Sequence, residues 1–214
     1  MHTTHVDDLP ELHRAAMTME TEREPSTMNT LVVAIRFTIV TTILFGLGYP
    51  LIVTGLAQMT MPKKADGQLI VRDGHVIGST IIGQSFTSPG YFHGRPSAAG
   101  NGYDPTSSGG TNWAPTNQKL IDRIAADVAT DQKMNPGKPV PIDLVTASGS
   151  GLDPDVSPAA ALYQVPRVAA ARNLPESTVE ALVRSHIEGR QFGIFGDERV
   201  NVLELNLALD AAKH

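Results

Sequence analysis

The sequence predicts an α+β protein in which a single N-terminal transmembrane helix precedes one soluble domain with a small β-sheet and several helices. Three observations predict this fold class. Residues 37–57 contain no Asp, Glu, Lys, Arg or His, a β-hairpin pattern follows them, and the C-terminal half places apolar residues at helical spacing. The 214 residues suffice for one domain of ordinary size and an appendage. We therefore expect three parts, which are residues 1–27, 31–58 and 65–214.

The composition excludes several classes of function. The absence of cysteine excludes disulfides, thiolate zinc sites and cysteine nucleophiles. The formal charge of -5 argues against a nucleic-acid partner, because such proteins present a basic face to the phosphates. Hydrophobic residues make up 41% of the chain, which is enough to build a core and excludes a wholly disordered protein.

Residues 1–27 are predicted to form a disordered, acidic N-terminal extension. The segment is polar, is interrupted by Pro10 and Pro25, and shows no sustained apolar period. Met28 directly precedes the apolar run and resembles a natural start of the chain. We therefore expect the extension to have no role in the fold.

Residues 31–58 are predicted to form the transmembrane helix. As a helix, residues 37–57 would reach about 32 Å, which matches the hydrocarbon core of a bilayer. The alternatives are a buried helix of a soluble core or a signal peptide, but the run is longer than a signal peptide's apolar region. Gly46, Gly48 and Pro50 would permit a kink and the close approach of neighbouring helices. The pattern thus favours a span that packs against other membrane helices.

The charges that flank the span do not determine its orientation. Arg14, Arg23 and Arg36 precede the uncharged run of residues 37–57, whereas Lys63 and Lys64 follow it. Because the side richer in Lys and Arg normally remains in the cytoplasm, this nearly equal count leaves both orientations open.

The soluble domain is predicted to begin with a hairpin and a long aromatic loop. Asp73-Gly74 lies between the apolar strands of residues 68–80 and supplies the positive φ of a type I′ turn. Residues 86–116 are rich in Gly, Pro, Ser and Asn but hold five of the eleven aromatic residues of the chain, which are Phe86, Tyr91, Phe92, Tyr103 and Trp113. We expect their rings to order this loop by packing onto the domain or onto a partner.

Four helical segments are predicted after this loop. Residues 117–133 place apolar side chains on one face, with Thr116 as the cap. Ser157-Pro158 begins a second helix that Pro166 should kink or restart. Residues 175–187 form a third, ended by Gly189. Asn201 is the expected cap of the last helix, whose inward residues are Leu203, Leu207 and Ala208.

A search for catalytic motifs finds no P-loop, no zincin motif, no nucleophile elbow and no aspartyl-phosphate signature. The scattered histidines do not predict a metal site. The Ser148-Gly149-Ser150-Gly151 loop could expose amides to an anion, although a tight turn that needs glycine is the favoured interpretation. A rival hypothesis is a membrane-anchored enzyme that uses three residues of the aromatic loop, which are His93, Arg95 and Asp104.

Several longer motifs resemble one known family. They are Ile82-Gly83-Gln84-Ser85-Phe86, Gly90-Tyr91-Phe92-His93-Gly94-Arg95-Pro96-Ser97, Ser108-Gly109-Gly110-Thr111-Asn112, the stretch from Asp143 through Ser148-Gly149-Ser150-Gly151 to Asp153, Gln164-Val165-Pro166-Arg167-Val168-Ala169, and the stretch from Val202 to Asp210. In this order they resemble the KdpC family, whose members belong to the Kdp potassium-transporting P-type ATPase. The resemblance covers nearly all of residues 28–212.

The resemblance implies a non-catalytic accessory subunit of a bacterial inner-membrane complex. Its implied partners are a channel-like potassium-translocating subunit, a P-type ATPase subunit, a small single-span subunit and membrane lipid. The implied role is assembly and stabilisation of the complex. The implied topology places the C-terminal domain in the periplasm.

A second role that the resemblance implies is that of a catalytic chaperone, which raises the affinity of the ATPase subunit for ATP through a transient ternary complex. No firmly bound cofactor and no metal are implied. ATP would be a transient ligand, and the residues expected to contact it are Val145, Ser148, Gly149, Gly151, Gln164 and Arg167. We favour the assembly role, because ATP is scarce in the periplasm.

Overall fold

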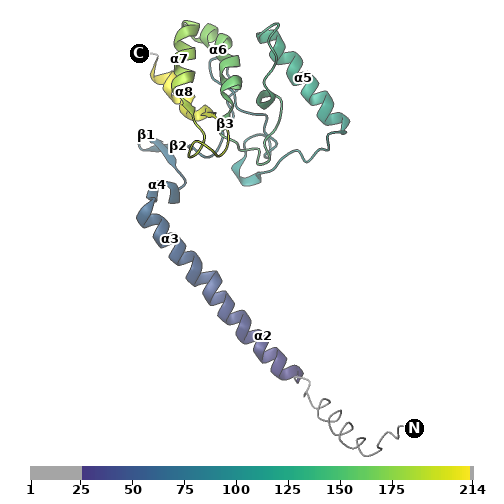
Figure 1. The fold of residues 1–214 in the computed structure, drawn as a ribbon, viewed down its shortest axis with the longest axis vertical. Coiled ribbons are helices and arrows are strands. Elements are labelled where there is room, and N and C mark those ends of the chain that lie inside the picture. Colours follow the sequence, from purple (N-terminus) through teal and green to yellow (C-terminus); the bar gives the residue numbers. More distant parts are fainter. Residues whose placement is uncertain (1–25, 213–214) are drawn as a thin grey trace, which may run out of the picture. The chain divides into compact units, whose positions relative to one another are not determined.

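The computed structural model describes residues 26–212, so most of the predicted extension lies outside the described residues. Contacts divide the chain into two compact units, Met1–Thr60 and Met61–His214. Each unit is described by itself below, with the elements labelled as in Figure 1.

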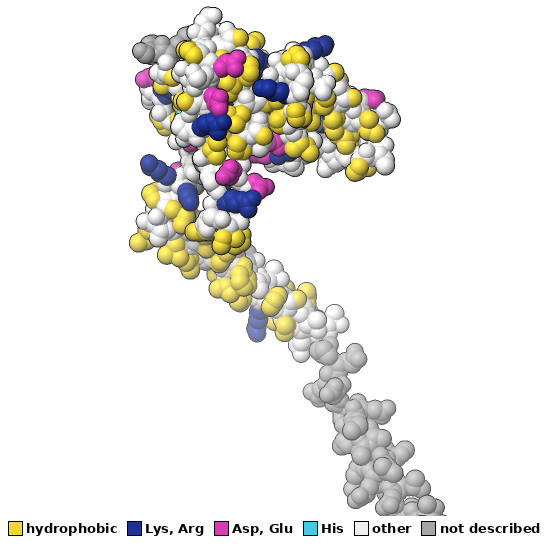
Figure 2. All heavy atoms as spheres, turned by 45° about the horizontal axis from the view of Figure 1, so that its top comes forward, with side chains coloured by type: hydrophobic (Ala, Val, Ile, Leu, Met, Phe, Trp, Pro, Cys, Tyr) yellow, Lys and Arg dark blue, Asp and Glu magenta, His cyan; other side chains and the backbone are white. Residues whose placement is uncertain are grey.

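The described part of the first unit contains one long apolar helix, Thr27–Thr60, with a mean hydropathy of 2.1. It consists of α2 (Thr27–Thr41), a π-helical segment η2 (Thr42–Gly48) and α3 (Tyr49–Thr60), and none of their residues is buried. Hydrophobic side chains cover its visible face in Figure 2. By length and composition this helix is the one candidate membrane span among the described residues.

The π-helical segment ends just before Pro50. Proline has no N–H to donate and its ring crowds the carbonyl four residues earlier, so regular hydrogen bonding must change at this point. The N–H of Tyr49 donates to the carbonyl of Leu44, five residues back. The predicted perturbation at Gly46, Gly48 and Pro50 is therefore present as a wider turn.

The second unit begins with α4 (Pro62–Ala65) and the hairpin of β1 (Leu69–Arg72) and β2 (His75–Ser79). Asp73 and Gly74 have φ of 52° and 78°, which confirms the predicted type I′ turn. A three-stranded antiparallel sheet follows in the order β3-β5-β4, made of Asp155–Val156, Arg199–Asn201 and Ile187–Glu188. The described strands thus form two small sheets, where the sequence indicated one.

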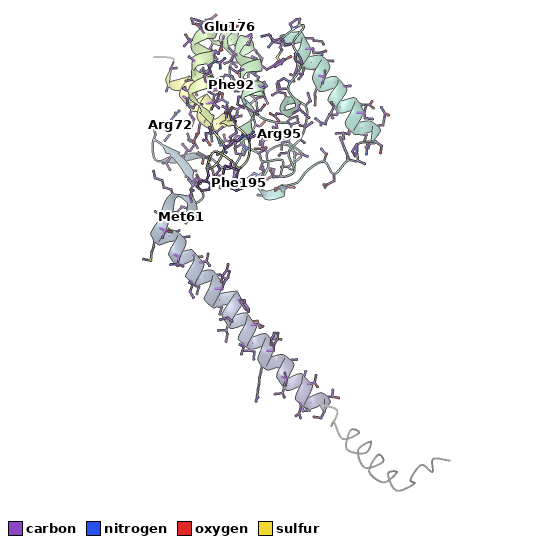
Figure 3. All side chains as sticks on the ribbon, in the orientation of Figure 1. Met61, Arg72, Phe92, Arg95, Glu176 and Phe195 are labelled. Atoms are coloured by element: carbon purple, nitrogen blue, oxygen red, sulfur yellow. The ribbon has the colours of Figure 1, made fainter. Side chains whose placement is uncertain are left out.

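The core lies between this second sheet and the helices α6 (Pro158–Arg172), α7 (Glu176–Ser185) and α8 (Val202–Ala211). Its fully buried side chains include Val168, Val179, Val183, Val200, Leu205 and Leu209, together with Phe92 from the aromatic loop. Figure 3 shows Phe92 among these helices. The loop therefore contributes the largest of these fully buried side chains to the core.

Helix α5 (Gln118–Met134) has no buried residue, so the predicted inward face of residues 117–133 is only partly covered. Ile121 on that face is 46% exposed. The predicted cap at Thr116 is wrong: Asn117 is the cap, and its side chain accepts from the N–H of Lys119. An amide side chain can cap as well as a hydroxyl, and Asn117 is one residue nearer to the first turn.

Two further helix predictions need correction. Helix α6 runs without a restart through Pro166, because seven buried side chains hold it in place against the loss of one hydrogen bond. Helix α7 ends at Ser185, well before Gly189, because Ile187 pairs with Val200 in the sheet.

Two short 3-10 turns complete the unit, η3 (Pro105–Ser107) and η4 (Ile142–Leu144). The predicted cap of the last helix is confirmed, since the side chain of Asn201 accepts from the N–H of Glu204. The predicted inward face of α8 is only partly correct. Leu203 is buried, but Leu205 and Leu209 are the fully covered residues, whereas Leu207 and Ala208 are half-buried.

Candidate functional site

Two side-chain amides bind the main chain of the aromatic loop at consecutive residues. Phe92 N–H donates to Asn206 Oδ1 at 2.8 Å, and Asn206 Nδ2 donates to the Phe92 carbonyl at 2.9 Å. His93 N–H donates to Gln164 Oε1 at 2.8 Å, and Gln164 Nε2 donates to the His93 carbonyl at 3.0 Å. We call this arrangement the amide clasp. Each side-chain amide makes the two main-chain hydrogen bonds that a neighbouring strand would otherwise make, and both amides are buried.

Arg167, one turn beyond Gln164 on α6, fastens the residues just before the clasp. Its Nη1 donates to the carbonyls of Pro89 (2.6 Å) and Tyr91 (2.9 Å), and its Nη2 donates to Gln164 Oε1 at 2.6 Å. Its buried Nε has no hydrogen-bond partner. Burial lowers the pKa of Arg167, and the negative charge of Asp131 opposes this shift. The Nε–H donor of the guanidinium is therefore unused.

Arg172 and Asp210 hold the same segment at Gly90 and Tyr91. Arg172 Nε donates to the Gly90 carbonyl at 2.6 Å, and its Nη1 lies 2.8 Å from Asp210 Oδ1. The guanidinium also lies 4.5 Å from the centre of the Tyr91 ring, whose hydroxyl donates to Asp210. The prediction that the rings pack onto the domain is confirmed for Tyr91 and for the buried Phe92, whereas Trp113 is 37% exposed.

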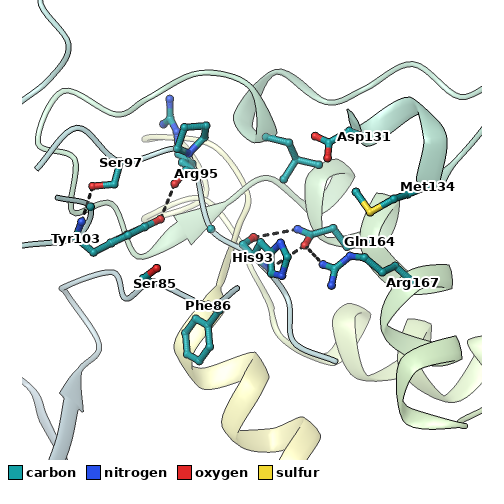
Figure 4. A pocket seen from close by; sticks show the side chains of 14 residues that line it. Ser85, Phe86, His93, Arg95, Ser97, Tyr103, Asp131, Met134, Gln164 and Arg167 are labelled. Atoms are coloured by element: carbon teal, nitrogen blue, oxygen red, sulfur yellow. Dashed lines mark hydrogen bonds between the residues drawn. The ribbon is translucent and has the colours of Figure 1, made fainter. Parts of the chain in front are cut away.

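A pocket of about 260 Å³ lies beside the clasp (Figure 4). Its polar lining includes His93, Arg95, Asp131, Gln164 and Arg167. Burial, and next the charge of Arg167, lower the pKa of His93, while a hydrogen bond with the Ser88 carbonyl opposes them. Burial and the charge of Asp127 raise the pKa of Asp131. The volume lies just below the usual range of about 300–1,000 Å³ for ligand pockets, which fits a small ligand or part of a larger one.

Only two of the six residues predicted to contact a nucleotide line this pocket. Gln164 and Arg167 line the pocket, whereas Val145, Ser148, Gly149 and Gly151 do not. Gly151 has φ of 67°, and a Cβ there would lie 2.7 Å from both the Ala99 nitrogen and the Gly109 carbonyl oxygen. This geometry favours the tight-turn interpretation of residues 148–151.

The residues of the rival enzyme hypothesis do not converge. His93 and Arg95 line the pocket, but Asp104 does not; its carboxylate caps η3 by accepting from the N–H of Thr106 at 2.9 Å. Arg95 is paired with Asp153 at 3.0 Å. Among the described residues, no cluster of three or more His, Cys, Asp or Glu side chains could hold a metal.

Sequence reasoning missed Asn206 and Arg172 as partners of the loop, and Asp131 as part of the pocket lining. Asn206 carried a usable signal, because an amide inside an otherwise apolar helical stretch must find a buried hydrogen-bond partner. Arg172 and Asp131 carried no such signal in the sequence, since charged residues on helices are usually solvated.

Comparison with known proteins identifies the family. Residues 31–211 match the family model described as KdpC, the c chain of the K+-transporting ATPase. This chain belongs to the KdpC family. The match covers most of the chain and confirms the resemblance seen in the motifs.

Three relatives named potassium-transporting ATPase KdpC subunit illustrate the match. Those of Koribacter versatilis and Acidobacterium capsulatum are each 57% identical over 183 residues, which is 86% of this chain and 95% and 98% of theirs. That of Methylobacterium nodulans is 53% identical over 194 residues, or 85% of this chain and 94% of its own. The KdpC match therefore includes both the apolar helix and the soluble unit.

Proposed function

We propose that this KdpC-family chain is a non-catalytic accessory subunit that assembles and stabilises the Kdp potassium-transporting ATPase. Its proposed partners are the channel-like subunit, the P-type ATPase subunit and the small single-span subunit. The apolar helix would anchor it in the inner membrane and pack against the other spans. The soluble unit, in the periplasm, would hold the translocating subunit from outside.

The amide clasp carries this proposal. Gln164 and Arg167, the residues that would otherwise be the best candidates for ligand chemistry, direct most of their hydrogen bonds to the main chain of residues 89–93. Their effect is to make a loop without regular structure rigid. A rigid surface binds a partner at a smaller entropic cost than a mobile one, which suits an assembly subunit.

Two alanine substitutions test the proposal as a matched pair. Gln164→Ala and Asn206→Ala each remove one amide of the clasp and leave a buried N–H without its acceptor, which costs about 1–3 kcal/mol. Only Gln164 lines the pocket. An assembly subunit predicts the same phenotype for both variants: less intact complex after purification, and an unchanged KM for ATP in the complex that remains.

The chaperone role predicts a different result from the same pair. If the pocket contacts nucleotide, Gln164→Ala should raise the KM for ATP of fully assembled complex, whereas Asn206→Ala should not, because loss of a binding contact appears in KM. That difference would contradict the assembly proposal. Loss of assembly in both variants, with KM unchanged, would support it.

One observation favours the chaperone as a second candidate function. The unpaired Nε of Arg167 belongs to a guanidinium that lines the pocket together with Arg95, and such cations bind phosphate oxygens well. The pocket of about 260 Å³ would admit only part of a nucleotide. Equilibrium binding of ATP to the purified full chain, compared with Arg167→Gln, tests this role directly. Binding that Arg167→Gln abolishes would support it.

The periplasmic location is part of the proposal and needs its own test. A C-terminal alkaline phosphatase fusion is active only outside the cytoplasm, whereas a C-terminal fluorescent protein that folds only inside it reports the opposite side. Activity of the phosphatase fusion alone is expected. Fluorescence without phosphatase activity would place the soluble unit in the cytoplasm and would favour the chaperone.

A further inference from the structure

The loop between β4 and β5, residues 189–198, exposes three large apolar side chains. Phe192, Ile194 and Phe195 are 83%, 72% and 64% exposed. Soluble surfaces seldom leave neighbouring large apolar side chains uncovered, so such a group indicates a contact with a protein or a membrane. Phe192 also has φ of 55°, an uncommon conformation for a bulky residue that points to a functional role.

This loop starts from the part of the soluble unit where the chain leaves the span. The apolar helix ends at Thr60, and α4 begins at Pro62, so the first residue of α4 lies within about 7 Å of the last residue of the span. Lys64 of α4 lines the same hollow as Glu188 and Arg199, the two residues at the base of the loop. Figure 3 shows Phe195 and Met61 at the same end of this unit.

Four hydrogen bonds within the loop satisfy part of its backbone. Gln191 and Phe195 bond each other in both directions, at 2.9 and 3.0 Å. Gly193 N–H donates to the Arg190 carbonyl, and Ile194 N–H donates to the Gln191 carbonyl. A segment that enters lipid must satisfy its backbone internally, because an unpaired group costs several kcal/mol there.

The side-chain chemistry also fits lipid better than protein. The exposed tip consists of hydrocarbon side chains, which insertion into a membrane favours, whereas the strongest contacts at protein interfaces are enriched in Trp, Tyr and Arg. Four charges at the base form two ion pairs, Arg190 with Asp197 at 3.3 Å and Arg199 with Glu188 at 2.6 Å, and Glu198 is exposed to water. The base can therefore remain in water while the tip enters the membrane.

We propose that Phe192, Ile194 and Phe195 insert into the interfacial layer of the bilayer that the chain itself spans. The loop would be a second attachment of the soluble unit to the membrane and would restrict how that unit tilts about the end of the span. Because the attachment is apolar, high salt should not release it. This inference does not depend on the assembly role or on which side of the membrane the soluble unit lies.

Depth-dependent fluorescence quenching tests the proposal with the full chain in phosphatidylcholine vesicles. The sole tryptophan is removed by Trp113→Phe, and Ile194→Trp or Ile142→Trp is then added. Ile142 is a matched control, since it is 70% exposed and lies outside the loop. Brominated lipids should quench and blue-shift the emission of the Ile194→Trp variant, most strongly with bromines about 5–10 Å below the headgroups. The Ile142→Trp variant should lose little emission.

Three outcomes would overturn the proposal. Equally weak quenching of both variants would leave the loop in water. Equally strong quenching of both would mean that the whole soluble unit lies on the lipid. Protection of the Ile194→Trp variant from a water-soluble quencher only when the other subunits are bound would assign the loop to a protein contact. Thermal unfolding of the soluble unit at the same temperature in both variants checks that neither substitution disturbs the fold.

Discussion

Single residues order the aromatic loop, because it has no neighbouring strand to bond. Phe92 is fully buried, and its main chain is paired with Asn206. His93 is paired with Gln164 in the same way. Removing either amide leaves buried polar groups unsatisfied, so each position is constrained more by hydrogen bonding than by side-chain volume. The same contacts explain why a loop rich in Gly, Pro and Ser can present a fixed surface.

The glycines of the 148–151 loop allow a prediction at the scale of single residues. Gly151→Ala should destabilise the soluble unit by about 1–3 kcal/mol, because φ of 67° strains alanine and its Cβ would meet two backbone atoms at 2.7 Å. Gly149→Ala is the matched control, since nothing lies within 4 Å of its Cβ position, and it should change stability by about 0.5 kcal/mol or less. Urea unfolding of the full chain in detergent measures both. Equal effects would contradict the tight-turn interpretation.

At the scale of elements, the helices differ in how much of their predicted face is covered. The apolar period of residues 117–133 correctly predicted a helix, yet α5 buries none of its residues. Helix α6, whose sequence contains a proline, buries seven. Periodicity reports which side chains share a face, but burial depends on what packs against that face. The span shows the same limit, since none of its residues is buried in the isolated chain.

The sequence predicted that Gly46 and Gly48 together allow a neighbouring helix to approach. The structure keeps both in a continuous helical segment, and residues two positions apart point to different faces of a helix. One neighbouring helix can therefore contact only one of them closely. A Cβ at Gly46 would lie 3.6 Å from Thr42 Cγ2, which is an ordinary contact, so the chain's own packing does not require glycine there.

Gly46→Leu should therefore weaken attachment to the other subunits without weakening the helix, because leucine is the better helix former. The measurement is the amount of the other subunits that co-purifies in mild detergent. Gly55→Leu is the control, since nothing lies within 4 Å of its Cβ position and it points to a different face. Unchanged co-purification of Gly46→Leu would mean that this glycine faces lipid.

At the scale of the whole molecule, the described residues form an apolar helix and a compact α+β unit that join at Thr60 and Met61. The family match begins at residue 31, and helix α2 begins at Thr27 with Ser26 as its cap. Both boundaries lie close to the predicted start at Met28. That residues 1–27 form a separate extension thus stays a prediction. The starts of the family match and of α2 agree with it.

Deletion of residues 1–27 should leave membrane insertion and potassium transport intact. The deletion also removes the Ser26 cap, which accepts from the Asn29 N–H at 3.3 Å and contributes about 1 kcal/mol to helix formation. Deletion of residues 1–25 keeps this cap and serves as the comparison. Growth at limiting potassium and membrane fractionation measure the effects of both deletions. Loss of growth with the shorter deletion would assign the extension a role.

The sequence by itself determined the apolar span, the Asp73-Gly74 turn, the Asn201 cap and the family. Each of the first three depends on residues within a few positions of one another, and the family depends on the order of short motifs. Only the tertiary structure decided what Gln164, Arg167 and Asn206 do. Their hydrogen bonds join residues 71 to 114 positions apart, and no local pattern specifies which distant main chain a buried polar group will meet. The same reason applies to the covered faces of the helices, since burial is a property of two surfaces and a sequence pattern describes one.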